Sequence, residues 1–270
     1  MPDFQVRERD SSGEVLQGEI SEEIPDGFVF IRLKSQWFCN DAGLTSVEFA
    51  GIEYFCVGRR VMAFVEPVSA EQAEDKAAQA YERIREVLGV TEIPEIFRYF
   101  ASVPAFLHDF FMNFRKFVLS AGKLDEKRKL LIAAAVVGQG GSSRWLDFLA
   151  TFAEARGVSR VEMAEALAVG ATNSMYNVLF KFRDISGTDV FNGMGVGLRA
   201  HTFQGTSLDE TTVELINLSL SDINSCKPCT SAHVAKVRQS GVADEAIYEA
   251  IQCAATMVAG VQFLRSIGVS

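Results

Sequence analysis

The stretch that decides the fold and the chemistry of this chain is Leu208–His233, LDETTVELINLSLSDINSCKPCTSAH. In a helix, Cys226, Cys229 and His233 stand at positions i, i+3 and i+7, so two thiols and an imidazole share one stripe. Sulfur attacks as a thiolate, so a proton acceptor within one turn of a thiol favours nucleophilic chemistry. A second thiol three residues away can close a disulfide on the first. Together with Glu214, twelve positions before the first cysteine, the stretch is predicted to be a redox site.

The Leu-Asp-Glu that opens this stretch also occurs earlier in the chain, as Leu124-Asp125-Glu126. We call the distance along the chain from Leu124 to Leu208 the repeat offset. At this offset and without a gap, Gly157-Val158 aligns with Gly241-Val242. Each copy follows the pattern helix, break, helix, Gly-Val turn, helix, with an acidic first turn and a glycine that suits a left-handed cap. We therefore expect two three-helix units, at about residues 123–175 and 207–259, packed about a pseudo-twofold axis.

The repeat also provides an internal control for the predicted site. A purely structural need for Glu, Cys, Cys and His would be expected in both copies. The positions one repeat offset before these four hold Leu130, Ser142, Trp145 and Leu149 instead. The copy at about 123–175 is therefore interpreted as degenerate and the copy at about 207–259 as active, with the chemistry added to one of two equivalent scaffolds.

The chain before the helices has a different pattern. Residues 1–68 contain the β-rich run Phe28–Leu33, alternating apolar and acidic residues over Val47–Tyr54, and a further apolar run at Val61–Val65. These runs predict three or four short strands in a meander. No catalytic constellation occurs there. Residues 69–270 have helical periodicity and are expected to form one helical domain.

Composition excludes several classes of protein. The chain has 270 residues, 48% of them hydrophobic, and a net charge of -9, which argues against nucleic-acid binding and favours a cytoplasmic protein. We find no apolar run that we expect to span a bilayer, and no apolar core of a signal peptide at the start. Five cysteines are too few for a disulfide framework in a chain of this length, and Cys39, Cys56 and Cys253 are expected to be buried, inert thiols.

Here the chain resembles a known family. The pattern Glu-x11-Cys-x2-Cys-x3-His, followed by Gly241-Val242-Ala243-Asp244-Glu245, is similar to the carboxymuconolactone decarboxylase superfamily, in particular its alkylhydroperoxidase AhpD-like branch with its longer, peroxidase-related members. The resemblance covers roughly residues 70–265. It implies an all-α fold and an oxidoreductase that reduces organic (alkyl) hydroperoxides through a dithiol/disulfide cycle. We expect no cofactor and no metal.

The resemblance also implies roles for single residues. Cys229 matches the peroxidatic cysteine and Cys226 the partner that resolves its sulfenic acid, while Glu214 and His233 match the proton relay. Some members have a histidine directly before the second cysteine; Pro228 stands there in this chain, which leaves the relay one member short. The residues themselves leave open which sulfur attacks first.

Partners follow from the same resemblance. The disulfide must be reduced again by an external dithiol reductant protein. Members of the family assemble into homo-oligomers, and the aromatic residues at 97–117 fit contacts between subunits.

Three other interpretations compete with the peroxidase. A thioredoxin fold lacks support because no βαβ pattern surrounds the two cysteines, although a protein disulfide reductase or a redox-sensing dithiol on the helical scaffold stays open. A zinc site is the second, because Cys226, Cys229 and His233 are suitable ligands, but no fourth ligand is evident nearby. The third is the decarboxylase side of the superfamily, whose members typically lack the dithiol.

Overall fold

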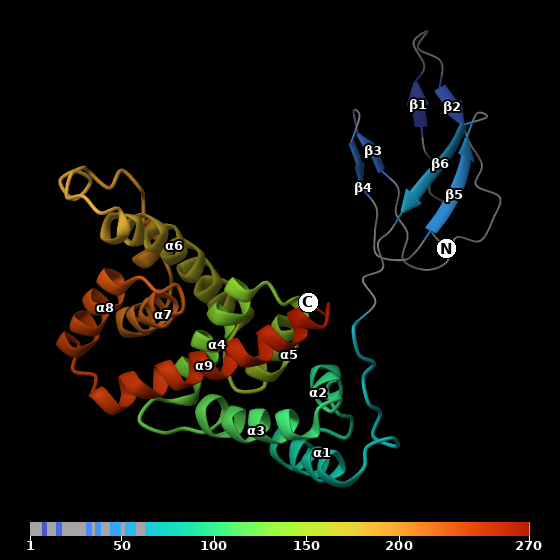
Figure 1. Ribbon diagram of the computed structural model, residues 1–270, viewed down its shortest axis with the longest axis horizontal. Helices are drawn as coiled ribbons and strands as arrows, with labels where there is room; N and C mark the ends of the chain where they lie inside the picture. The colour runs from blue at the N-terminus through green and yellow to red at the C-terminus, as the bar shows by residue number, and fades with distance from the viewer. Residues whose placement is uncertain are drawn as a thin grey trace. The chain divides into compact units, whose positions relative to one another are not determined.

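The computed structural model describes residues 63–269 and, before them, the backbone of six short strands (Figure 1). The chain divides into two units, residues 1–62 and residues 63–270. The helical unit thus begins before the boundary expected after residue 68. The reason is that the extended segment ahead of the first helix is already bound to this unit: Phe64 N donates to Ile267 O at 2.7 Å and Val68 N to Arg98 O at 3.0 Å.

Among the described residues of the first unit, the strands pair antiparallel, β1 with β2, β3 with β4 and β5 with β6. The strands predicted near residues 28–33 and 47–54 are present as β3, β5 and β6. No strand forms at Ala63–Val65, because the backbone there binds the end of the last helix instead; the first two residues of that predicted run lie outside the described residues. The strand bounds are β1 Arg7–Arg9, β2 Val15–Gln17, β3 Ile31–Leu33, β4 Gln36–Phe38, β5 Leu44–Phe49 and β6 Ile52–Val57.

The second unit is helical, and no strand occurs between residues 63 and 269. The predicted all-α fold of this part of the chain is confirmed. Its helices are α1 Asp75–Leu88, α2 Glu95–Phe100, α3 Pro104–Phe114 with the π-helical turn η1 Arg115–Leu119, α4 Glu126–Gly140, α5 Ser143–Glu154, α6 Arg160–Ile185, the 3-10 turn η2 His201–Phe203, α7 Glu210–Ile223, α8 Lys227–Gln239 and α9 Asp244–Ser266.

The repeat predicted from sequence is visible in the helix starts. Helices α7, α8 and α9 begin one repeat offset after α4, α5 and α6 respectively. The caps repeat as well: the Asp125 side chain accepts from Arg128 N at the start of α4, and the Asp209 side chain accepts from Thr212 N at the start of α7. A side-chain acceptor for a free N–H group of the first turn fixes where each helix begins.

Contacts between the two copies are reciprocal. Glu249 on α9 accepts from Lys123 N at 2.9 Å, ahead of the first copy. Glu165 on α6 accepts from Ser207 N at 2.9 Å, ahead of the second copy. Glu165 and Glu249 are related by the repeat offset, as are Lys123 and Ser207. A pair of contacts in which each copy holds the other in the same way is what a twofold axis between them generates.

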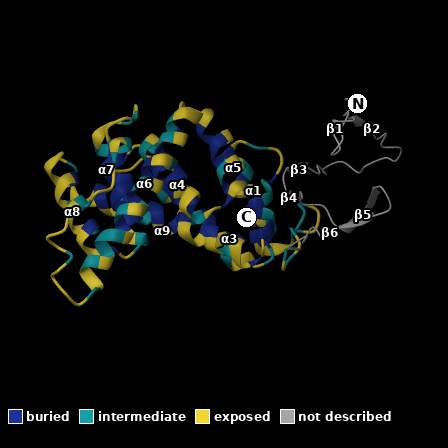
Figure 2. Cartoon of the chain, turned by 90° about the horizontal axis from the view of Figure 1, so that it is seen from above, coloured by how far each residue is buried: buried dark blue, intermediate teal, exposed yellow. Residues whose placement is uncertain are grey.

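The aromatic residues at 97–117 do not lie where we expected them. Phe97, Phe100, Phe110 and Phe114 are at most 3% exposed, and their rings pack around Trp145 at 5.6 to 6.1 Å between centroids. They form a core within the chain, because their helical spacing places them on the face that Trp145 of α5 covers. Figure 2 colours the helices by burial. Our expectation that these aromatic residues form contacts between subunits is therefore wrong. The homo-oligomer stays a prediction.

Among the described residues, one helix, α9, is long and apolar enough to cross a membrane. This differs from our expectation that the chain has no such run. Half of its apolar window is buried in the unit, and it packs against α3, α4 and α7. This is the packing of a core helix. The cytoplasmic location stays a prediction.

Candidate active site

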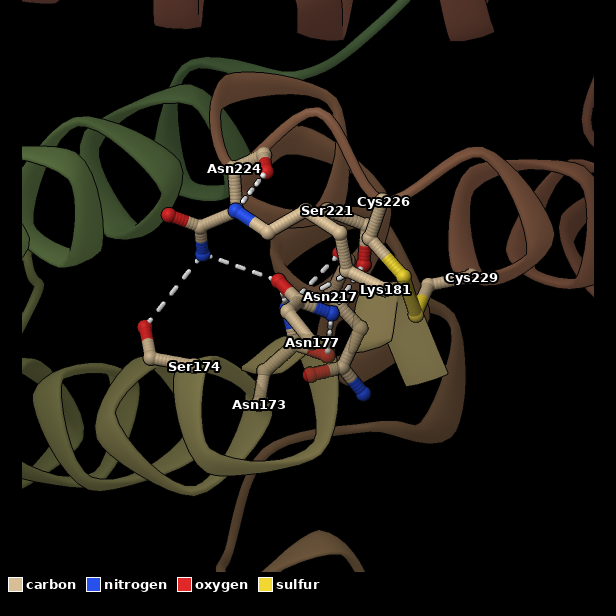
Figure 3. Close-up of a disulfide and its surroundings, with 9 residues drawn as sticks. All are labelled: Asn173, Ser174, Asn177, Lys181, Asn217, Ser221, Asn224, Cys226 and Cys229. Atoms are coloured by element: carbon tan, nitrogen blue, oxygen red, sulfur yellow. Dashed lines mark hydrogen bonds between the residues drawn. A yellow bond between two sulfur atoms is a disulfide. The ribbon is translucent and has the colours of Figure 1, made fainter. Parts of the chain in front are cut away.

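The two cysteines lie at the start of α8 and are joined by a disulfide (Figure 3). A sharp turn leads into them: Ser225 has a φ of 54°, and Cys226 N donates to Ser221 O at 2.9 Å, which ties the turn to the end of α7. Cys226 caps α8 and Cys229 lies in its first turn. Pro228 fits between them, since an N–H group in the first turn of a helix has no partner within it.

The position of the sulfurs affects their reactivity. At a helix start, unpaired N–H groups and the positive end of the helix dipole stabilise a thiolate. Cys226 is fully buried, whereas Cys229 keeps 7% of its surface exposed. Both cysteines are thus buried, and Cys229 is the one that keeps a small exposed surface.

Glu214 on α7 holds two side chains of α8. Its Oε2 lies 2.6 Å from His233 Nδ1, and its Oε1 accepts from Lys236 Nζ at 3.1 Å. Burial raises the pKa of the Glu214 carboxyl, but the hydrogen bonds and charges of His233 and Lys236 outweigh burial and hold this pKa below its usual value. Because a carboxylate binds Nδ1, the proton of the neutral ring resides there, and Nε2 is left as the basic atom.

The structure brings together the four residues predicted from sequence in two pairs, Cys226 with Cys229 and Glu214 with His233. Sequence reasoning missed Lys236, although it follows His233 by one turn on the same stripe of α8. This lysine adds positive charge beside the carboxylate from the exposed side of the site.

Cys253 behaves as expected for an inert thiol. It is fully buried on α9, and its Sγ donates to Lys129 O at 3.4 Å. Burial raises the pKa of this thiol to about 12, so it stays protonated at neutral pH. Cys39 and the side chain of Cys56 lie outside the described residues.

A cluster of buried polar side chains lies between α6 and α7, beside the disulfide (Figure 3). Asn173 Nδ2 donates to Asn217 O at 3.1 Å, and Asn177 Nδ2 donates to Ser221 Oγ at 3.0 Å. Asn224 Nδ2 donates to Asn177 Oδ1 at 2.8 Å. We call Asn173, Asn177, Asn217 and Ser221 the amide cluster. Sequence reasoning missed it, although the repeat contains a signal for it.

A cavity of about 530 Å³ opens beside the same helix start. Its wall is formed by the end of α6, the turn that follows, and Pro228, which stands between the two cysteines. Phe180 gives the cavity an aromatic surface, and the Arg183 guanidinium lies 5.5 Å from the centroid of that ring. Among the described residues, no three His, Cys, Asp or Glu side chains are grouped so that they could hold a metal ion.

Comparison with known proteins gives the family. The model of the carboxymuconolactone decarboxylase family matches residues 106–180 and 194–269, together more than half of the chain. The protein therefore belongs to the carboxymuconolactone decarboxylase family. Each of the two matches ends in or just after the third helix of one copy of the repeat.

Relatives named alkyl hydroperoxide reductase AhpD are similar to part of the chain. The protein from Anaeromyxobacter sp. (strain Fw109-5) is 28% identical over 140 residues, 52% of this chain and 75% of the relative. The one from Corynebacterium kroppenstedtii is 32% identical over 127 residues, 42% of this chain and 72% of the relative. The one from Hyphomonas neptunium is 31% identical over 145 residues, 52% of this chain and 78% of the relative. The crystal structure of an alkylhydroperoxidase AhpD core, an uncharacterized peroxidase-related protein from Ralstonia eutropha JMP134, is 14% identical with a TM-score of 0.44, covering 76% of this chain and 93% of its own.

Proposed function

We propose that this protein is a thiol-dependent peroxidase that reduces organic (alkyl) hydroperoxides with the dithiol of Cys226 and Cys229. One observation carries the proposal: the disulfide at the start of α8 lies one turn before His233, whose ring binds the buried carboxylate of Glu214. A reactive thiol needs such a base, and a redox cycle needs such a second thiol. The relatives named alkyl hydroperoxide reductase support the same chemistry.

The proposed cycle starts from the reduced dithiol. His233 Nε2 takes the proton of the Cys229 thiol, and the thiolate attacks one peroxide oxygen. The O–O bond breaks, the alkoxide leaves as the alcohol with the proton from His233, and Cys229 becomes a sulfenic acid. The Cys226 thiol then attacks this sulfur, water leaves, and the disulfide forms. Overall, two thiols and one hydroperoxide give one disulfide, one alcohol and one water.

Glu214 supports this proton transfer by binding the other nitrogen of the His233 ring. Its carboxylate binds Nδ1 of His233, so it orients the ring and stabilises the imidazolium that forms when Nε2 takes the proton. Because Pro228 carries no titratable group, the relay in this chain consists of Glu214 and His233 alone.

An external dithiol protein is the proposed electron donor. Its thiolate attacks Cys229, the cysteine that keeps some exposed surface, and forms a mixed disulfide; its second thiol then releases the reduced enzyme. We propose that the organic group of the hydroperoxide occupies the cavity beside Pro228, whose volume suits a small ligand.

Peroxide consumption with dithiothreitol as the electron donor tests this function. The wild-type protein should consume cumene hydroperoxide at a rate proportional to enzyme concentration. Phe180→Ala should raise the KM for cumene hydroperoxide about tenfold and leave the rate with hydrogen peroxide unchanged, because only the organic substrate uses the aromatic wall. Phe182→Ala is the matched control, since this ring is 47% exposed and packs on Phe191 at 4.9 Å between centroids.

Two outcomes would count against the proposal. A wild-type protein that reduces a protein disulfide but consumes no peroxide would favour the disulfide reductase on the same fold. Equal KM values for the wild type and both phenylalanine variants would show that the organic group binds elsewhere.

A further inference from the structure

The polar residues of the amide cluster have no polar counterparts in the other copy of the repeat. By the repeat offset, the contact between α6 and α7 in one half of the unit corresponds to the contact between α9 and α4 in the other. Both sites are buried: no residue of either set is more than 4% exposed. The contact between α6 and α7, beside the dithiol, is polar, and the equivalent contact between α9 and α4, which we call the twin site, is apolar. At the twin site, Met257, Val261, Ala133 and Val137 stand in place of Asn173, Asn177, Asn217 and Ser221 respectively.

This difference argues against a role in folding alone. Burying an amide costs free energy unless both its N–H and its C=O find partners. The twin site shows that this scaffold packs there with apolar side chains. Within the described residues, the Asn217 side chain is fully buried, and neither its Nδ2 nor its Oδ1 has a hydrogen-bond partner.

The two helices of the site place Asn217 at the level of Cys229. Glu214, Asn217 and Ser221 stand at i, i+3 and i+7 on α7, the same spacing as that of the two cysteines and the histidine on α8. The helices run antiparallel: at one end of the pair the Glu214 side chain binds His233, and at the other end Cys226 N donates to Ser221 O in the turn that joins them. Asn217 lies one turn after Glu214 and Cys229 one turn before His233, so the two residues lie at the same level of the helix pair.

We propose that Asn217 is a positioning residue for the reactive sulfur: its Nδ2 donates to the Cys229 thiolate once the disulfide opens. A sulfur in a disulfide accepts a hydrogen bond weakly, whereas a buried thiolate needs a donor. The other members of the cluster hold α6 and α7 together behind Asn217, because Asn173 binds its backbone oxygen. The inference rests on the proposed redox function only in assuming that the disulfide is reduced in the working protein.

The consequence is a shift of the redox equilibrium. Two electrons and two protons from an external dithiol break the S–S bond, and the amide gains its partner only in the reduced state. Asn217→Leu, close in shape but without the donor, should raise the equilibrium constant for oxidation by glutathione disulfide about ten- to hundredfold. Tenfold corresponds to about 30 mV in a two-electron couple.

The experiment measures this equilibrium on the full-length protein in glutathione buffers, with the rate of Cys229 alkylation against pH as a second readout. The Cys229 pKa should rise in Asn217→Leu. The titratable groups of the site, Glu214 on α7, His233 and Lys236 on α8 and Lys181 on α6, are the same in the variant. Neither readout uses peroxide, so a failure here differs from a failure of the proposed peroxidase.

Ser219→Ala is the matched control. Ser219 is buried on α7 but its hydroxyl donates to Leu215 O within the helix, away from the stripe that faces α8. The substitution should change neither the redox equilibrium nor the Cys229 pKa. An unchanged equilibrium and pKa in Asn217→Leu would overturn the proposal, as would an equal change in both variants.

A measurement on the wild-type protein covers the case in which Asn217→Leu does not fold. The side-chain amide protons of Asn217 should move downfield in the NMR spectrum on reduction and become more protected from exchange. Identical amide shifts and exchange rates in the two redox states would overturn the proposal.

Discussion

Cys229→Ser should abolish peroxide consumption, whereas Cys226→Ser should complete a single turnover and stop at the sulfenic acid. Cys229 keeps a small exposed surface and precedes His233 by one turn, so in the proposed cycle it is the sulfur that loses its proton and meets the peroxide. Cys226 is fully buried, and its proposed role is to close the disulfide. Without it, nothing in the described site condenses with the sulfenic acid.

Dimedone labelling, which traps sulfenic acids, measures this division of roles. The label should appear on Cys229 in Cys226→Ser and be absent from Cys226 in Cys229→Ser. Cys253→Ser is the control and should turn over like the wild type, because burial keeps that thiol protonated. A label on Cys226 in Cys229→Ser, with none on Cys229 in Cys226→Ser, would reverse the two roles.

Removing either member of the proton relay should slow the reaction with peroxide by a similar large factor. Glu214 binds Nδ1 of His233 at 2.6 Å, so Glu214→Gln removes the charge that supports the imidazolium, and His233→Gln removes the base. General acid–base assistance is worth about 10²- to 10⁴-fold. The double variant should be little slower than either single variant, because members of one unit are not additive. Stopped-flow measurement of the second-order rate constant of the reduced protein provides the comparison.

Lys236→Met is the control for this pair. Lys236 also contacts Glu214, but its side chain is 57% exposed and carries no proton to the sulfur, so its loss should slow the reaction far less. If instead the losses from Glu214→Gln and His233→Gln multiply in the double variant, the two residues act independently and the relay is wrong.

The sequence predicts the helices of the repeat because their ends depend on local signals. The Leu-Asp-Glu starts predict acidic first turns for α4 and α7, and in the structure the Asp before each helix also caps it. The pairing of Glu214 with His233 was also predictable, since a short connection folds α7 and α8 back on each other. The element that covers the aromatic residues of α3 was not predictable, because helical spacing defines an apolar face but not what packs against it.

The parts of the site that sequence reasoning missed depend on packing between distant segments. Asn173 on α6 meets Asn217 on α7 across 44 residues of chain, so neither residue has a local signal. The repeat was the available signal: at the twin of Asn217 stands Ala133, a buried polar residue exchanged for an apolar one. The early start of the helical unit was missed for a similar reason, since the bond from Phe64 to Ile267 joins the two ends of that unit.

The most direct test of the proposed peroxidase activity is the chemical state of the thiols after one equivalent of peroxide. The reduced protein is mixed with one equivalent of cumene hydroperoxide, the remaining thiols are alkylated, and the intact mass and the peptides are measured. The account predicts the loss of two alkylated thiols, both mapped to Cys226 and Cys229 as one disulfide, with one equivalent of cumyl alcohol formed. Full alkylation of Cys226 and Cys229 after the peroxide would contradict it.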